Sequence, residues 1–364
     1  MKYFHFIPAA CIFLFCQCGG QDSHFLSDTK YIPVFSEDSC QYIDHGDNLH
    51  FTGAYSDASL FYDNMALICN QSDKKWGYID DSGELQYPAV YTRATIFNEN
   101  RAWVVRPDEA PCAIDTKGRL QLTLTRASKV MIFCEGMAAF AQKEKKGERW
   151  GFIDKSGTPV IKPLYKDVKP FSSGLAAVKN EQNLWGYIDS KGIEQIPAQF
   201  SSAESFSKER HAVVRSDKSG LFQVIDTKGD TLWTIECDAL ISDGNTFRIK
   251  KDKKWGWCDN KGNIFIEPRF EDSESFGNPD LAPVKIRGKW GYINRKGEWK
   301  IKRQFSKAFP FFDGLAVVQT GTVYPDGHFQ INPQYDRISE DYIHQSIRKG
   351  SAFTLVESDH ARYK

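Results

Sequence analysis

The chain has 364 residues, and its 47 Lys and Arg residues balance 47 Asp and Glu residues, so its formal net charge is zero. Without a bulk positive field a nucleic-acid partner is disfavoured, although a local basic patch is not excluded. Aromatic residues make up 14% of the chain, beside 27 glycines and 15 prolines. This supply of strand formers and turn residues favours an all-β fold.

The N-terminal segment has the pattern of an export signal. Residues 2–18 read KYFHFIPAACIFLFCQC, one basic residue followed by an apolar run that His5 and Pro8 interrupt. That run is too short for a comfortable membrane span. We therefore predict a signal peptide at residues 1–17, a tether at 18–38 and a repeat domain at 39–364.

The end of the apolar run, LFCQCGGQDS, resembles the lipobox of bacterial lipoproteins. The resemblance implies cleavage before Cys18 and acylation of that residue, which holds a protein on a bilayer without a spanning helix. Gln17 departs from the small residue usual before the modified cysteine, and Cys16 is the alternative lipidation site. A conventionally cleaved or uncleaved signal is the other interpretation.

The remaining cysteines form no C-x-x-C pair in the mature chain. Cys69, Cys134 and Cys258 lie in apolar, strand-like runs, which predicts buried thiols. In an oxidising compartment Cys112 could pair with Cys134, or Cys237 with Cys258. No metal site or cofactor is expected.

One phrase recurs along the chain: W-G-aromatic-I-D-x-x-G, then I-x-P-x-Y/F, then F-x-x-G-L-A-x-V. Its closing glycines are about 35 residues apart, a spacing typical of repeat proteins. Five copies are clear, and worn copies end at Gly118, Gly229 and Gly327, which gives about eight units. The signature residues of the clear copies are Trp76, Gly77, Asp80, Gly83, Trp150, Gly151, Asp154, Gly157, Trp185, Gly186, Asp189, Gly192, Trp255, Gly256, Asp259, Gly262, Trp290, Gly291 and Gly297.

The phrase resembles the WG-repeat (KWG-repeat) family, and the resemblance covers about residues 60 to 345. It implies a β-rich repeat domain common in bacterial surface and secreted proteins, with no agreed catalytic residues.

Residues 171–200 show how one unit is expected to fold. LAAV predicts a short strand, NEQN a turn, and WGYID a second strand with aromatic residues at alternate positions. Asp189 and Gly192 suit a type I turn with a glycine bulge. IEQI predicts a third strand, which Pro197 ends or confines to a sheet edge. The glycine beside each Trp is expected to admit a close backbone or ring.

One such meander cannot bury its own apolar face, so the units must stack. Eight small units favour a seven- or eight-bladed β-propeller, with an open β-solenoid as the alternative. Residues 39–51 could complete a blade or cap the array, and AFTLV near the C-terminus could close the last blade.

The recurrent Asp residues also invite a reading as calcium ligands or paired acids, and the recurrent Trp residues one as a carbohydrate-stacking row. We favour turn residues for the Asp set, because a calcium loop needs several oxygen ligands within a dozen residues. We favour core residues for the Trp set because of its strict period. Six of the Asp residues share one turn position: Asp80, Asp115, Asp154, Asp189, Asp226 and Asp259.

Catalytic motifs are missing from the sequence, which has no G-x-S-x-G, G-x-x-x-x-G-K-[ST], G-x-G-x-x-G or H-E-x-x-H. Glu99, Glu135 and Glu209 lie in the F-x-x-G-L-A segments and could meet as acids at an axis, but solvated turn residues are the favoured reading. The most divergent stretches, where a specific function would reside, are 106–112, 143–149 and 277–283.

These observations predict a non-catalytic lipoprotein of the bacterial cell envelope, at the outer membrane or cell surface. Its partners would be the membrane, through the anchor, and a protein, peptide or envelope polymer bound to the repeat surface. The alternatives are a glycan-binding or glycan-active protein with a site at the propeller axis, and a structural envelope component.

Overall fold

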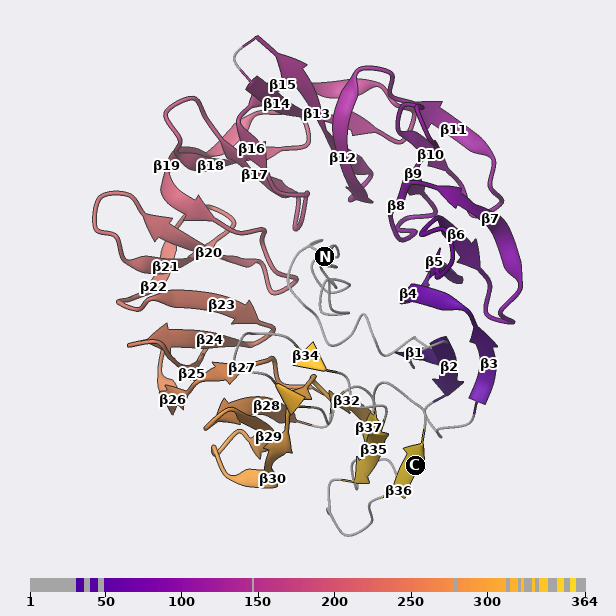
Figure 1. Cartoon of the computed structure of the whole chain (residues 1–364). Helices are drawn as coiled ribbons and strands as arrows, with labels where there is room; N and C mark the ends of the chain where they lie inside the picture. Colours follow the sequence, from indigo (N-terminus) through magenta and orange to yellow (C-terminus); the bar gives the residue numbers. More distant parts are fainter. Residues whose placement is uncertain are drawn as a thin grey trace. The chain divides into compact units, whose positions relative to one another are not determined.

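The computed structural model describes residues 31–35, 40–44, 49–145, 147–277, 280–311 and 315–319, and five short strands beyond them at 322–323, 329–330, 334–339, 346–349 and 354–357. All regular elements in these residues are β-strands, as Figure 1 shows. No helix within this part of the chain is long and apolar enough to cross a membrane. The all-β prediction is confirmed, whereas the signal, Cys16, Cys18 and Gly327 lie outside the described residues.

The chain divides into two compact units. The first contains Tyr55–Gly220 and Ile225–Asp230, and the second contains Leu221–Val224, Thr231 onward, and the strands before Tyr55. Most of the sheets in each unit are small and antiparallel, with strands in sequence order (Figure 1). The exception is the last five-stranded sheet, in which a parallel pair joins residues 334–339 to 354–357.

The first unit holds three four-stranded sheets of this kind and the first four strands of a larger sheet. They are β4 (Tyr55–Tyr62), β5 (Met65–Asn70), β6 (Trp76–Ile79) and β7 (Leu85–Tyr91); β8 (Arg93–Ala94), β9 (Ala102–Val105), β10 (Cys112–Ile114) and β11 (Leu120–Thr123); β12 (Ala127–Cys134), β13 (Met137–Glu144), β14 (Gly147–Asp154) and β15 (Pro159–Tyr165); β16 (Asp167–Val168), β17 (Leu175–Lys179), β18 (Trp185–Asp189) and β19 (Glu194–Ala203). β20 (His211–Ser216) pairs with β19, and β21 (Phe222–Asp226) and β22 (Thr231–Ile235) follow along the chain.

The second unit repeats the pattern. Its sheets are β1 (Tyr31–Phe35), β2 (Cys40–Asp44) and β3 (Leu49–Gly53); β23 (Ala239–Asp243), β24 (Thr246–Lys251), β25 (Lys254–Asp259) and β26 (Ile264–Phe270); β27 (Asp272–Ser273), β28 (Leu281–Ile286), β29 (Lys289–Asn294) and β30 (Trp299–Phe305); β31 (Lys307–Ala308), β32 (Leu315–Gln319), β37 (Thr354–Glu357), β35 (Gln334–Ser339) and β36 (Ser346–Lys349); and the pair β33 (Thr322–Val323) and β34 (Phe329–Gln330). β37 pairs with β32, as expected for the AFTLV segment.

Each repeat thus forms a four-stranded meander, the kind of sheet that makes a propeller blade. The F-x-x-G hairpin joins the first two strands, and W-G opens the third. The D-x-x-G turn joins the third strand to the fourth, as Asp189 and Gly192 do between β18 and β19. The predicted order of strands and turns is confirmed.

Pro197 was expected to end its strand or confine it to a sheet edge. The first expectation is wrong, whereas around Pro197 the strand pairs only with β18, as an edge does. β19 runs through Pro197 to Ala203, because the register changes from Tyr187↔Ile196 to Trp185↔Phe200 and leaves a bulge between them. A residue without an N–H costs no ladder hydrogen bond inside a bulge.

The bulge also explains the glycine beside each tryptophan. A methyl group placed on Gly186 would lie 2.6 Å from the Ile196 oxygen and 2.7 Å from the Ala198 nitrogen. Gly77, Gly151, Gly256 and Gly291 meet the bulged backbone of their own fourth strands in the same way. The close approach expected from the sequence is therefore a backbone contact that any side chain would block.

Candidate functional site: shared scaffold and local departures

The signature tryptophans belong to the scaffold. Trp150, Trp185 and Trp290 are 5–8% exposed, and Trp76 and Trp255 are half-buried. Lys179 lies over the Trp185 ring at 5.8 Å from its centroid. These five positions therefore do not form a row of accessible rings on which sugars could stack.

The aromatic residue two positions after each tryptophan joins one repeat to the next. Tyr187 packs on Phe206 of the following F-x-x-G segment, with ring centroids 4.8 Å apart, and its hydroxyl donates to the Glu204 oxygen at 2.8 Å. Tyr292 repeats both contacts with Phe311 and Phe309. Burial raises the pKa of both phenols well above the ordinary value.

The recurrent aspartates build their turns. Asp189 Oδ1 accepts the backbone N–H groups of Lys191 and Ile193, both at 2.9 Å, and Gly192 takes a φ of 79°. The hydrogen bond from Ile193 is the main cause of the lowered pKa of Asp189. Asn294 makes the same two contacts with Lys296 and Glu298. Because an amide can replace the carboxylate there, the position needs an acceptor oxygen and no charge.

The F-x-x-G carboxylates have a role that the sequence did not reveal. Glu99 Oε2 accepts the Gly136 N–H of the next repeat at 3.0 Å and pairs with Lys155 at 2.9 Å. Glu135 accepts the Gly174 N–H at 2.9 Å in the same manner. The favoured reading as merely solvated turn residues is incomplete for these two, which connect successive hairpins. Glu209 is exposed and makes no such contact in the described residues.

The described cysteines include buried thiols at Cys69 and Cys258. Burial raises the pKa of Cys258 to about 12, so that thiol is inert at neutral pH. Cys112 and Cys258 are both free, and neither disulfide suggested by the sequence is formed. No group of three or more His, Cys, Asp and Glu residues able to hold a metal occurs in the part of the chain that the structure describes.

One repeat departs from the pattern inside the core. Arg248 is 6% exposed and stands where the repeats on either side carry Val213 and Pro283 and where the sheet β16–β19 carries Ala177. Its guanidinium donates to the Ser273 oxygen and lies 3.5 Å from Glu274. Burying a charged side chain costs free energy unless each of its polar atoms has a partner, so a buried Arg is unexpected at this position of the repeat.

The same joint holds a second buried charge. Asp243 is 8% exposed, accepts the Phe276 N–H at 3.4 Å and lies near Arg248. Burial raises the pKa of Asp243 and also that of Glu274. Arg248 Nε and Ser273 Oγ have no hydrogen-bond partner among the described residues. We name Asp243, Arg248, Ser273 and Glu274 the polar joint.

The three divergent stretches lie outside this core. In 106–112, Arg106 forms an exposed ion pair with Glu109 at 3.7 Å. Residues 143–149, described except at 146, lie at the end of the β13–β14 hairpin, and 277–283, described except at 278 and 279, lead into β28. The three divergent stretches therefore lie in loops or at hairpin ends.

Comparison with known proteins identifies the repeat. The model of the family described as WG containing repeat matches residues 76–106, 150–183, 185–218, 255–290 and 290–324. These are the five clear copies, so the chain carries five WG containing repeats. No curated protein matches the chain.

Solved structures with a similar course of the chain include BamB from Moraxella catarrhalis, at 12% identity and a TM-score of 0.43, covering 74% of this chain and 92% of that one. Hsv2 from Kluyvelomyces marxianus has 9% identity and a TM-score of 0.43, with coverages of 68% and 96%. Apo AztD from Citrobacter koseri has 11% identity and a TM-score of 0.41, with coverages of 90% and 96%. Similarity at this level carries no statement about function.

Proposed function

We propose that this chain of WG containing repeats is a non-catalytic scaffold that is exported, held in the bacterial cell envelope by a lipid on Cys18, and binds a protein, peptide or envelope polymer. The observation that carries the proposal is that the signature residues build the scaffold and other residues form its surface. Signature side chains pack between repeats or bond their own turns, as Tyr187 and Asp189 do. The side chains left at the surface differ from one repeat to the next, which is the condition for a specific binding face.

The anchor is tested by metabolic labelling with an alkyne fatty acid in a bacterial host, followed by membrane fractionation. We expect label on the wild type and on Cys16→Ala, and its loss from Cys18→Ala together with release from the membrane fraction. Label on Cys18→Ala but not on Cys16→Ala would move the anchor to Cys16. Label on all three chains would overturn lipidation at either residue.

The binding role is tested separately by photo-crosslinking in intact cells. A benzoylphenylalanine residue is placed at Glu109 or Lys145, in two divergent stretches, and at Lys191, in a signature turn, as the matched exposed control. We expect covalent adducts at one of the first two positions and none at Lys191. Absence of adducts at every position would contradict the scaffold proposal.

The glycan alternative receives no support from the tryptophans, because the five signature rings are buried or half-buried in the described residues. Glu99 and Glu135, the carboxylates considered for an axial pair, are each bonded to a neighbouring hairpin.

A further inference from the structure

The β13–β14 hairpin is the longest W-G hairpin in the described residues. Each of its strands has eight residues, against five in β17 and β18 and six in β24 and β25. The additional length comes from the cross-strand pairs Lys143↔Glu148 and Glu144↔Gly147. This repeat therefore extends a longer arm than its neighbours.

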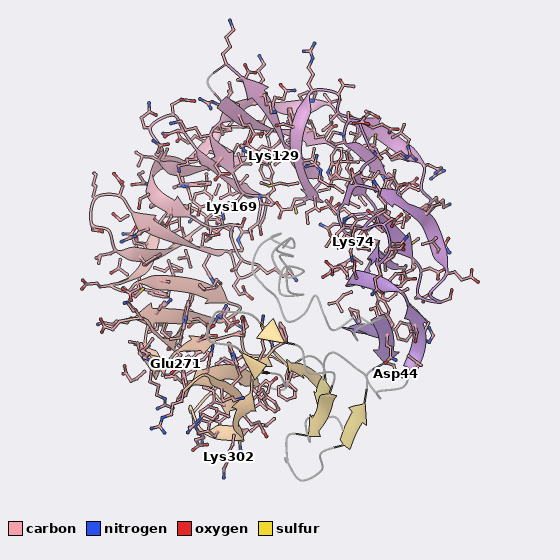
Figure 2. All side chains as sticks on the ribbon, viewed as in Figure 1. Asp44, Lys74, Lys129, Lys169, Glu271 and Lys302 are labelled. Carbon is pink, nitrogen blue, oxygen red and sulfur yellow. The ribbon has the colours of Figure 1, made fainter. Side chains whose placement is uncertain are left out.

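The sequence of the arm has a net positive charge, whereas the whole chain has a formal net charge of zero. Residues 142–149 read QKEKKGER, with four basic and two acidic side chains. Glu148 is already engaged by Ser128 at 2.8 Å and by Lys129, labelled in Figure 2, at 2.7 Å. Arg149 pairs with Glu181 at 2.8 Å. Lys143 has no ion pair within the described residues.

A shallow hollow of about 530 Å³ lies at the base of this arm, between the start of β12 and the end of β13. Its lining residues are Thr125, Arg126, Ala127, Ser128, Gln142, Lys143 and Glu144. Arg126 and Lys143 are both exposed there, and neither forms an ion pair in the part of the chain described, although Lys143 stands opposite Glu148 across the hairpin. The hollow thus presents two exposed cations beside one acidic side chain, Glu144.

The backbone beside these cations also has hydrogen-bonding capacity to spare. The Ala127 N–H closes a turn onto the Leu124 oxygen, whereas the N–H groups of Thr125 and Arg126 donate no hydrogen bond among the described residues. β12 is the first strand of its sheet, and its ladder to β13 skips Ser128 between Ala127↔Gln142 and Lys129↔Ala141. Thr125 and Arg126 form the turn that leads into β12, and β12 is an edge strand, to which an extended peptide can add.

We propose that this hollow docks an acidic peptide segment of a partner protein, with side-chain carboxylates on Arg126 and Lys143 and the peptide backbone along Thr125–Ser128. The proposal rests on the scaffold function and specifies one of its faces and partners. Glu144 on the lining disfavours a uniformly anionic polymer, which would bring like charge against it. A peptide can place a neutral residue there and carboxylates on the two cations.

The test uses the full chain and a fluorescein-labelled L-peptide of ten alternating Asp and Ser residues, followed by fluorescence anisotropy. Arg126→Gln combined with Lys143→Gln is expected to weaken binding about tenfold or more, the size typical for losing paired charges at an interface. The matched control, Lys191→Gln with Lys228→Gln, removes the same charge from two exposed turns and should change affinity by less than about twofold. Circular dichroism checks that both variants are folded.

The D-enantiomer of the peptide separates docking from general charge attraction. We expect it to bind far more weakly than the L-peptide, because it cannot follow a strand edge with the same side-chain placement. Equal binding of both enantiomers, or equal weakening by the control variant, would overturn the proposal. Tighter binding of alginate, with the same dependence on Arg126 and Lys143, would assign the hollow to a polymer and overturn the peptide.

The outcome is separable from that of the scaffold proposal. Failure of the peptide to bind, together with crosslinked adducts at Glu109, would reject this hollow and leave the scaffold function standing. Absence of adducts at every position would reject the scaffold function itself.

Discussion

At the scale of single residues, the repeat depends on positions at which few amino acids fit. Gly186 faces the bulged backbone of β19, and Asp189 supplies an acceptor to two N–H groups of its own turn. The first position is restricted by space and the second by hydrogen bonding. The two restrictions predict different responses to substitution.

Gly186→Ala is expected to destabilise the chain by about 3 kcal/mol, the upper end for overpacking, because the added methyl would meet backbone atoms that cannot rotate away. The measurement is the free energy of unfolding from urea denaturation. Gly136→Ala is the control, since Gly136 has a φ of 77° but open space around it. It should cost about 1 kcal/mol. Equal effects would show that the bulge contact is not limiting.

The turn aspartates make stability depend on pH. The pKa values of Asp154, Asp189 and Asp259 are lowered in the folded chain. Their carboxylates therefore contribute stability that is complete above the unfolded pKa, near 3.9, and is lost as the pH falls through the folded pKa. Acid should weaken the turns below about pH 4.

Replacing these three aspartates by Asn should reduce that loss, because Asn294 shows that an amide oxygen accepts the same N–H groups. We expect the urea midpoint of the triple variant to fall less between pH 5 and pH 3 than that of the wild type. An unchanged acid sensitivity would place the effect in other carboxylates.

At the scale of elements, successive sheets are joined at the F-x-x-G hairpins. Glu99 connects its hairpin to Gly136 and Lys155 of the next repeat, and Glu135 does the same with Gly174. Sequence reasoning identified both residues as candidates but could not place them. Their partners are 37 and 39 residues away, and no local pattern encodes that distance.

Glu99→Ala should destabilise the chain by about 1–2 kcal/mol, because it removes a charged acceptor from the Gly136 N–H and a partner from Lys155. Urea denaturation gives the value. Glu209→Ala is the control, since Glu209 is an exposed carboxylate at the same kind of turn. It should change stability by less than about 0.5 kcal/mol. A comparable loss in the control would mean that the hairpin contact contributes nothing specific.

Substitutions in the polar joint test how its charged residues affect the stability of the chain. Arg248→Ala leaves the buried Asp243 and the partly exposed Glu274 without their counter-charge, and we expect a loss of about 3 kcal/mol in urea denaturation at pH 7. The raised pKa values of these two carboxyls mean that the unpaired charges oppose folding most at high pH. The loss should therefore shrink as the pH falls towards 5 and they take up protons.

The chain's own repeats supply the matched rescue. Asp243→Ser, Arg248→Ala and Ser273→Ala together introduce the residues that the chain carries at the corresponding joint as Ser172, Ala177 and Ala203. An apolar joint of similar packing should restore stability to the wild-type value or above it. A triple variant no more stable than Arg248→Ala would indicate that the polar joint stabilises this interface in a way the consensus residues do not.

At the scale of the whole molecule, the fold is a series of neighbouring contacts. Each sheet contributes side chains to the next one along the chain, as Ile161 does, whose Cγ1 would lie 3.3 Å from a methyl group placed on Gly192. Stability in such a series is close to a sum of repeat terms and nearest-neighbour terms. A local defect should therefore stay local.

Hydrogen exchange followed by mass spectrometry checks this expectation in the first unit. Glu99→Ala should accelerate amide exchange in the two sheets that Glu99 joins, β8–β11 and β12–β15, and affect β16–β19 much less. Uniform acceleration over all three sheets would show that the unit opens as one cooperative body.

Local chemistry explains how much of the fold was predictable. Alternating aromatics marked β18, and Asp189 with Gly192 marked the following turn, because both signals act over a few residues. The setting of Pro197 was not predictable, because it depends on pairing between strands and not on neighbouring residues. A proline excludes a regular ladder, but the bulge that accommodates it lies opposite Gly186, where the register shifts, and only the assembled sheet reveals it.

Only part of the candidate site was predictable from the sequence. The sequence located the basic stretch 143–149 by its divergence, but the hollow also needs Arg126, from the turn before β12. Arg248 and Asp243 drew no attention in the sequence, since single polar letters within a strand pattern are common. Their burial makes them unusual.

The sequence by itself determined the all-β class, the repeat and the residues of its turns, because each depends on periodicity or on hydrogen bonds between near neighbours. The tertiary structure alone decided which hairpins Glu99 and Glu135 connect, that Arg248 is buried, and that Arg126 and Lys143 share one hollow. These are distances between side chains far apart in the chain, and they exist only once the sheets have stacked.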